Sequence, residues 1–222
     1  MAKPKRRSLI DNNLQLEEVE PLTYNQRKAF DSLNNLVLCG SAGTGKTFIS
    51  LYLAFDDILK DQYSGVTLIR SAVPTRDIGF LPGSEKEKSK IYETPYYNIC
   101  NELFGRGDAY EILKNKGIVE FMTTSYLRGL TLNDTVIIVD ETQNMSFHEL
   151  DSIITRVGKN CRILMCGDFY QSDLKVNGLA DFVSIIKTMD RFDFIEFDVE
   201  DIVRSDFVRD YLIQKHMFLK YR

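Results

Sequence analysis

Several patterns that mark other classes of protein are absent from this sequence. The four cysteines, at positions 39, 100, 161 and 166, form no Cys-x-x-Cys pair and have no metal-ligand spacing with His148 or His216. No apolar run approaches the roughly 20 residues of a membrane span, and the first residues lack the apolar region of a signal peptide. We therefore expect a cytoplasmic chain with reduced cysteines and without a membrane partner.

An excess of positive charge is also absent. The formal net charge is −4 and the isoelectric point is about 5.3, so the chain as a whole is not a basic nucleic-acid-binding protein. Any contact with nucleic acid must come from a local patch. The one basic cluster near an end, within residues 3–7, fits a solvated tail at least as well as a binding segment.

The length and composition fit one globular domain. The chain has 222 residues, of which 44% are hydrophobic and 27% are charged, and these values allow one large core. Residues 1–20 show little periodicity, with a basic start followed by Glu17, Glu18 and Glu20, and we expect them to form an N-terminal arm. A single domain is predicted to span residues 21–222.

Apolar runs typical of strands alternate with segments of helical periodicity along this domain. The run Val136–Val139 is β-branched throughout, as expected of a strand that is buried on both faces of a parallel sheet. We expect strands over 36–39, 66–69, 118–122, 136–139, 162–166 and 194–197. We expect helices that start near Thr23 and that cover 48–55, 92–113, 147–154, 178–189 and 205–216. The alternation predicts an α/β fold with a mainly parallel central sheet.

A glycine-rich loop joins the first predicted strand to the helix after it. Its residues match the pattern Gly-x-x-x-x-Gly-Lys-Thr, and the apolar run before it and the helical spacing after it are the context of a phosphate-binding P-loop. Glycines permit the backbone angles that turn successive N–H groups towards phosphate oxygens at a helix N-terminus. Lys46 is expected to pair with the β- and γ-phosphates, and the Thr47 hydroxyl to ligate Mg²⁺. The expected nucleotide-binding residues are Gly40, Ser41, Ala42, Gly43, Thr44, Gly45, Lys46 and Thr47.

Two adjacent carboxylates follow the β-branched strand. Because parallel α/β sheets bind ligands at the carboxyl ends of their strands, Asp140 and Glu141 are expected at the same edge as the P-loop. Asp140 has the position of a Walker B aspartate, which holds Mg²⁺ through its water shell. Glu141 would be the general base that orients and deprotonates the attacking water. The alternative is a pair of surface acids in a loop.

Three further polar residues are candidates by position. Gln26, shortly before the P-loop strand, has an amide that offers both a donor and an acceptor to the adenine edge. Gln171 lies three residues after Asp168 and is placed to contact the γ-phosphate or the attacking water. Arg204 is a candidate for stabilising charge on the transferring phosphoryl group. The alternatives are a solvated helix residue for Gln26 and a surface ion pair for Arg204.

The assembled motifs resemble those of superfamily 1 helicases, and in particular those of the PhoH (phosphate-starvation-inducible) family. The resemblance covers about residues 22–215, keeps the family's motif order, and is similar in its compact form to copies carried by tailed phages. The motifs that carry it are Gly40–Thr47, Arg70–Pro74, Gly79–Gly83, Leu127–Leu132, Asp140–Asn144, Gly167–Gln171 and Asp201–Ser205.

The resemblance implies an ATPase with a three-layer RecA-like P-loop NTPase core that acts on RNA or single-stranded nucleic acid. It implies that Gln26 reads adenine, that Gln171 senses the γ-phosphate and that Arg204 is the arginine finger, with ATP and Mg²⁺ as cofactors. Monomeric relatives among the helicases use two such cores, and this chain has room for one. We therefore expect a homo-oligomer, a hexameric ring, in which Arg204 acts in trans.

Two hypotheses differ in what this ATPase does. In the first it translocates on or remodels RNA or single-stranded DNA, along a path lined by Arg70, Arg76, Phe80 and Arg128. Contact with ATP phosphates, or loop anchoring, explains these arginines equally well. In the second it is a nucleotide-gated binding or adaptor protein with slow hydrolysis and no unwinding, which the acidic isoelectric point favours. A small-molecule kinase is disfavoured, because the adjacent carboxylates serve attack by water on ATP.

Overall fold

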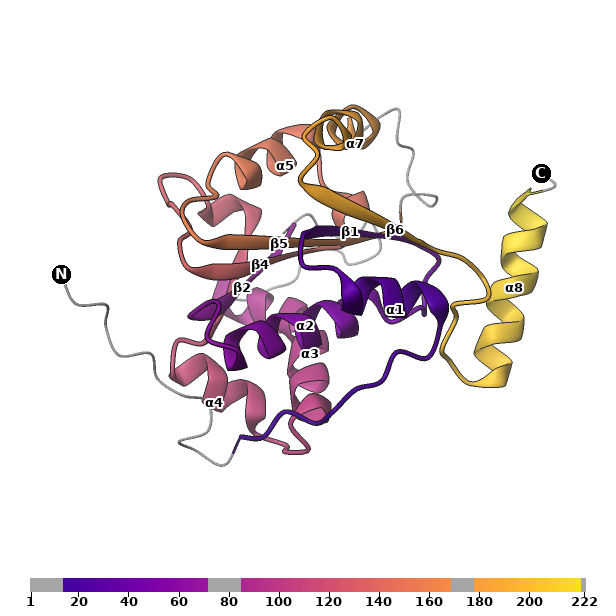
Figure 1. Ribbon diagram of the computed structural model, residues 1–222, viewed down its shortest axis with the longest axis horizontal. Helices are drawn as coiled ribbons and strands as arrows, with labels where there is room; N and C mark the ends of the chain where they lie inside the picture. The colour runs from indigo at the N-terminus through magenta and orange to yellow at the C-terminus, as the bar shows by residue number, and fades with distance from the viewer. Residues whose placement is uncertain (1–13, 72–84, 169–177, 221–222) are drawn as a thin grey trace.

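The computed structural model describes residues 14–71, 85–168 and 178–220, and it has an α/β fold built on one six-stranded sheet (Figure 1). All five pairs of neighbouring strands are parallel, which confirms the predicted fold class. The strand order is β3-β2-β4-β5-β1-β6. The strands are β1 (Asn35–Gly40), β2 (Gly65–Arg70), β3 (Val119–Thr123), β4 (Thr135–Asp140), β5 (Cys161–Gly167) and β6 (Phe192–Phe197).

Helices cover both faces of the sheet, so that the fold has three layers (Figure 1). One face carries α1 (Tyr24–Asp31), α2 (Lys46–Leu59), α3 (Glu85–Leu103) and α4 (Ala109–Asn115). The other face carries α5 (Phe147–Ile154) and α7 (Leu179–Lys187), and α8 (Asp206–Lys220) lies beside the sheet next to the P-loop end of the domain. None of the helices in the described ranges combines the length and the apolar character that a membrane crossing requires.

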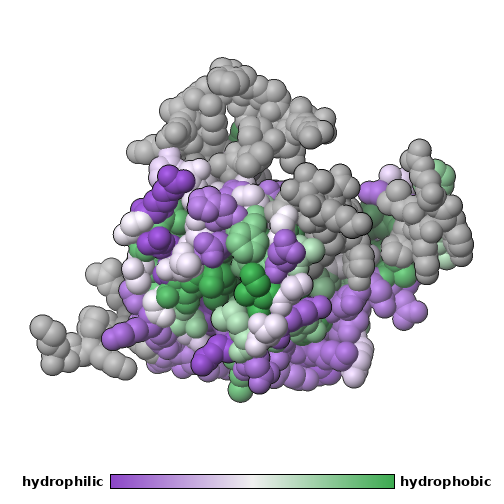
Figure 2. Space-filling view, turned by 90° about the horizontal axis from the view of Figure 1, so that it is seen from above, coloured by the Kyte–Doolittle hydropathy of each residue, from purple (hydrophilic) through white to green (hydrophobic). Residues whose placement is uncertain are grey.

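The strand sequences explain the two apolar layers. Successive side chains of a strand point to opposite faces, so Leu36 and Leu38 of β1 pack in the layer under α1–α4, while Val37 packs in the layer under α5 and α7. Seen from above, apolar side chains also gather on the surface over α5 and α7 (Figure 2). Ile185 of α7 is 51% exposed.

The predicted helix over 92–113 is wrong in its bounds. The structure has two helices, α3 and α4, and the chain turns between them at Gly105, whose φ is +57°. A left-handed backbone of this kind ends a helix at little cost only where the residue is glycine. α3 also begins seven residues earlier than predicted, at Glu85 rather than at Tyr92.

The arm joins the core before the predicted start of the domain. Leu14 is only 2% exposed and belongs to the apolar layer under α1–α4, with Leu16 and Val19 packed against it. The backbone N–H of Glu17 donates to the carbonyl oxygen of Leu103 at 2.8 Å. Residues 14–20 therefore lie as an extended segment on the domain, although the sequence indicated a packed part that starts near Pro21.

Candidate active site

The P-loop lies between β1 and α2 and has the backbone that the glycine pattern predicts. Gly40, Gly43 and Gly45 have φ values of +125°, +82° and +84°. A Cβ atom on Gly40 would come within 1.9 Å of the Phe197 carbonyl oxygen, so no side chain fits there. Gly45 precedes the first residue of the 14-residue helix α2. The free N–H groups at the start of α2 and those of the loop therefore face the same space. Together they favour the binding of an anion there.

Lys46 is folded back over the loop that it follows. Its Nζ atom donates to the carbonyl oxygens of Gly40 and Ser41 at 2.9 and 2.7 Å. Burial lowers the pKa of this ammonium group, and the acidic groups around it, among them Asp168 and Glu141, oppose that effect. A partly desolvated cation of this kind is stabilised by any anion that enters the loop.

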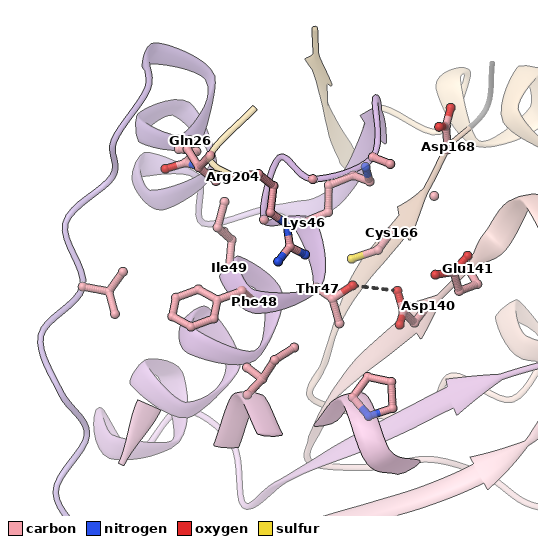
Figure 3. A pocket seen from close by; sticks show the side chains of 18 of the residues that line it. Gln26, Lys46, Thr47, Phe48, Ile49, Asp140, Glu141, Cys166, Asp168 and Arg204 are labelled. Atoms are coloured by element: carbon pink, nitrogen blue, oxygen red, sulfur yellow. Dashed lines mark hydrogen bonds between the residues drawn. The ribbon is translucent and has the colours of Figure 1, made fainter. Parts of the chain in front are cut away.

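Asp140 is buried and is hydrogen-bonded through both oxygens of its carboxylate. Its Oδ1 atom accepts a hydrogen bond from the Thr47 hydroxyl at 3.0 Å (Figure 3), and its Oδ2 atom accepts one from the Tyr96 hydroxyl at 2.9 Å. Burial raises the pKa of Asp140, the charge of Glu141 adds to this, and the hydrogen bonds from Tyr96 and Thr47 counteract it. A hydroxyl and a carboxylate that converge in this way are hard oxygen donors, which suit Mg²⁺. Thr47 and Asp140 would hold that ion.

Glu141 has a left-handed backbone, with φ of +54°. Such a conformation is uncommon for a residue with a side chain, and a glutamate is not among the residue types that favour it. The Oε2 atom accepts a hydrogen bond from Gln143 Nε2 at 2.5 Å, and Arg70 Nη2 lies 4.0 Å from Oε1. Gln143 in turn accepts at Oε1 from the N–H of Asp168, at 3.0 Å. The amide of Gln143 thus links Glu141 to the end of the neighbouring strand β5.

A cavity of about 760 Å³ joins these parts into one site. Its polar end contains the P-loop and the acidic pair, and its other end is bounded by apolar side chains of the arm, α2 and α3, among them Val19, Phe48 and Ile99. A cavity with a phosphate-binding end and an apolar end matches the two halves of a nucleotide. Ten predicted site residues line it: Gln26, Ala42, Gly43, Gly45, Lys46, Thr47, Arg70, Asp140, Glu141 and Arg204.

Gln26 is buried, and both the nitrogen and the oxygen of its side-chain amide are hydrogen-bonded to backbone atoms. Its Nε2 atom donates to the carbonyl oxygen of Thr44 at 3.2 Å, and its Oε1 atom accepts from the N–H of Leu22 at 2.8 Å. The side chain therefore ties the arm to the P-loop while it borders the cavity. Its role in reading adenine stays a prediction.

Arg204 points into the cavity of its own chain. Its side chain lies beside Lys46 and Ile49 (Figure 3), and a Cβ atom on Gly43 would come within 3.1 Å of its Cγ atom. Arg204 is held there because residues 198–205 return from β6 across the P-loop, to which Val203 N–H is hydrogen-bonded. Its action on a neighbouring subunit stays a prediction.

The remaining predicted residues are not gathered in this cavity. Arg128 is exposed and is not among the residues that line it. Gln171, Arg76 and Phe80 lie outside the described residues. Arg70, an expected residue of the nucleic-acid path, does line the cavity: its guanidinium lies 5.9 Å from the centre of the Tyr92 ring and faces the acidic pair.

The fold and the site define a P-loop nucleotide-binding protein, in which the P-loop strand β1 and the acidic strand β4 lie on either side of β5. Residues 18–214 match the family described as "PhoH-like protein". The chain belongs to this PhoH-like family, as its motifs suggested.

Curated relatives share about a third of their residues with this chain. The PhoH-like protein of Bacillus subtilis (strain 168) is 34% identical over 206 residues, which cover 90% of this chain and 64% of the relative. Protein PhoH of Escherichia coli (strain K12) is 31% identical over 183 residues, which cover 80% and 52%. The chain thus spans between half and two thirds of the length of these relatives. Among solved structures, the SWI2/SNF2 ATPase core of Sulfolobus solfataricus in complex with dsDNA is similar, with a TM-score of 0.45 and 11% identity over 82% of this chain and 47% of that one.

Proposed function

We propose that the chain binds ATP with Mg²⁺ and hydrolyses it, with Glu141 as the general base. One observation carries this proposal: the P-loop residues Lys46 and Thr47 face the same cavity as the adjacent carboxylates Asp140 and Glu141. The P-loop would bind phosphates, and a carboxylate next to it would accept a proton from the attacking water molecule. This combination suits transfer of a phosphoryl group to water.

Each residue has a separate task in the proposed reaction. The N–H groups of the loop and Lys46 bind the β- and γ-phosphates, and Thr47 and Asp140 hold the ion. When bound, Mg²⁺ neutralises charge on the phosphate oxygens. Arg204 stabilises the negative charge that develops on the transferring group, and its position supports action in cis.

Glu141 takes the proton of the attacking water. The water oxygen forms a bond to the γ-phosphorus while the bond from that phosphorus to the β–γ bridging oxygen breaks, so that ADP and phosphate result. Gln143 holds Oε2 of the carboxylate, which leaves Oε1 for the proton. A general base must be held within hydrogen-bond reach of the proton that it accepts, and the fixed backbone turn at Glu141 supports such a position.

Steady-state ATP hydrolysis tests the proposal. The wild type is compared with Glu141→Gln, which keeps the shape of the side chain and removes the base, and with Lys46→Ala, which weakens phosphate binding. We expect Glu141→Gln to lower kcat by about 10²–10⁴-fold, the usual contribution of a general base, and to retain ATP binding. Hydrolysis that is equal in the wild type and in Glu141→Gln would contradict the proposal.

We further propose that RNA or single-stranded DNA stimulates this activity. The supporting observation is that Arg70 ends β2 and that the exposed residues Tyr126 and Arg128 follow the adjacent strand β3, at the carboxyl edge of the sheet, where Arg70 also lines the cavity. An aromatic ring beside cationic groups suits stacked bases and phosphates. Hydrolysis is measured with each nucleic acid, with Arg128→Ala as the variant and Arg209→Ala of α8 as the control. No stimulation by either would instead favour the adaptor hypothesis.

We also propose that the chain assembles into a homo-oligomeric, hexameric ring. A ring provides the moving partner that one core lacks, although Arg204 in cis removes the need for a finger from a neighbour. Light scattering gives the mass with and without ATP. A monomer under both conditions would contradict this assembly and would leave the hydrolysis proposal intact.

A further inference from the structure

Tyr96 brings a hydroxyl group from α3 to the acidic strand β4. The residue is fully buried, and its hydroxyl donates to Asp140 Oδ2 at 2.9 Å. Its ring packs near that of Phe121, with ring centroids 5.8 Å apart. A phenylalanine would provide the same packing, so the hydroxyl group has one evident partner, the carboxylate of the proposed magnesium site.

The two oxygens of Asp140 are held from two different helices. Thr47, in the first turn of α2, occupies Oδ1, and Tyr96 of α3 occupies Oδ2. Asp140 is 5% exposed, so little water is available to replace either donor. With both bonds made, the carboxylate cannot rotate, and Oδ1 is the oxygen that faces Thr47. The orientation of the proposed metal-binding oxygen therefore depends on Tyr96.

The same side of α3 is also linked to Glu141, the second carboxylate of the pair, through Arg70. Tyr92 lies one helical turn before Tyr96, a spacing that places both rings on one side of a helix. The Arg70 guanidinium lies over the Tyr92 ring at 5.9 Å and reaches to 4.0 Å from Glu141 Oε1. α3 thus supports both carboxylates through two tyrosines.

We propose that Tyr96 is a positioning residue that orients Asp140 for Mg²⁺ in the nucleotide complex. The inference rests on the proposed binding of ATP with Mg²⁺. Outer residues that hold a metal-binding carboxylate typically change metal affinity by about 10–100-fold when they are removed. Tyr96→Phe removes one oxygen atom and keeps the ring, so it isolates this effect.

The experiment measures ATP binding by calorimetry in a Glu141→Gln background, in which ATP is not consumed. Binding is measured in EDTA and then over a series of Mg²⁺ concentrations. The matched control is Tyr97→Phe, the next residue of α3, whose hydroxyl donates to the Gly107 carbonyl oxygen at 2.7 Å on the exposed side. Both variants lose one phenolic hydrogen bond, but only the Tyr96 bond reaches Asp140.

In EDTA we expect equal ATP affinity for Glu141→Gln alone and for both double variants. The Mg²⁺ concentration that gives half of the increase in ATP affinity should rise at least about ten-fold with Tyr96→Phe and stay unchanged with Tyr97→Phe. Equal Mg²⁺ dependence in both variants would overturn the inference and leave the proposed function intact. A loss of ATP affinity already in EDTA with Tyr96→Phe would show a structural role only. If Glu141→Gln alone fails to bind ATP in any condition, the proposed function falls, and this inference falls with it.

Discussion

The backbone N–H of Val203 donates a hydrogen bond to the carbonyl oxygen of Gly43 at 3.1 Å. This bond fastens the segment between β6 and α8 to the middle of the P-loop. The next residue, Arg204, lies against the same glycine and borders the same cavity. Each chain therefore carries an arginine at its own phosphate-binding loop, where a finger from another subunit would otherwise have to enter.

The position of Arg204 predicts the result of a mixing experiment. Arg204→Ala should lower kcat by about a thousand-fold, the lower end of the usual effect of an arginine finger. Mixing this variant with Lys46→Ala should restore no hydrolysis, because each subunit lacks a residue of its own site. Arg209→Ala, which removes an exposed arginine of α8, should keep the wild-type rate. Recovery of activity in the mixture would show that Arg204 acts in trans between subunits.

Gln143 provides a second prediction, on the proposed base. Its amide donates to Glu141 Oε2 at 2.5 Å and accepts from the N–H of Asp168 at 3.0 Å. Gln143→Ala removes both bonds, so the Glu141 carboxylate becomes free to rotate. We expect kcat to fall by about 10–150-fold with an unchanged KM, because one hydrogen bond to a charged group contributes about 1.5–3 kcal/mol. Asn144→Ala is the control, since Asn144 Nδ2 is 3.5 Å from the same oxygen. If both variants lower kcat equally, the specific role of Gln143 is wrong.

The parts of the site that the sequence predicted are those that depend on residues adjacent in the sequence. The P-loop is a local pattern of glycines next to a helix start, and Asp140 directly follows a run of buried residues. Because parallel strands end at one edge of the sheet, their meeting in one cavity followed from the alternation of strands and helices.

The parts that could not be predicted depend on contacts between distant segments. Helical periodicity identifies the face of a helix that packs on the core, but it does not identify the atom that the Tyr96 hydroxyl group meets. Gln143 was recognised only as part of a motif, because its two bonds depend on how β4 and β5 are paired. The position of Arg204 in the cavity of its own chain depends on the path of the chain after β6, for which the sequence has no local signal.

Glu149 of α5 provides a prediction on stability and pH. Its carboxylate accepts hydrogen bonds from the Ser71 and Thr124 hydroxyls, at 2.8 and 2.7 Å, and from the backbone N–H of Ser146, at 2.9 Å. Burial alone would raise the pKa of Glu149, but these bonds outweigh it and lower the pKa. The ionised form is therefore favoured by folding, and it connects the ends of β2 and β3 to the start of α5.

The sign of the pH effect follows from this direction. Because the pKa is lower in the folded than in the unfolded chain, the carboxylate stabilises the fold above about pH 4.3, and this contribution is lost as the pH falls through the folded value. Glu149→Gln should reduce the free energy of unfolding at pH 7 by about 1 kcal/mol, a value limited by solvent screening of a partly exposed group. Urea unfolding should show this difference shrink towards pH 3. An exposed glutamate of β3 is the control, changed as Glu120→Gln, and a difference that is constant with pH would contradict the assignment.

The other end of the sheet contains a buried ion pair between Arg162 of β5 and Asp57 of α2. Arg162 Nη1 donates to Asp57 Oδ2 at 2.7 Å, and the same guanidinium donates to the carbonyl oxygens of Ser32 and Asn34 at 2.7 and 3.0 Å. The side chains are 4% and 7% exposed. The pair therefore connects the end of α1, the start of β1 and the end of α2 at the edge of the sheet opposite to the one that carries the site.

Removal of Arg162 alone should destabilise the fold strongly, because it leaves Asp57 buried without a partner. We expect Arg162→Met to reduce the free energy of unfolding by about 3–5 kcal/mol, measured by urea unfolding. The double variant Arg162→Met/Asp57→Leu should recover part of this loss, since no charge then stays buried; the two carbonyl oxygens still lack their donor. Lys60→Met is the control: its exposed pair with Asp56, at 2.6 Å, should contribute less than about 1 kcal/mol. If the double variant is no more stable than Arg162→Met, the unpaired charge of Asp57 is not the cause of the loss.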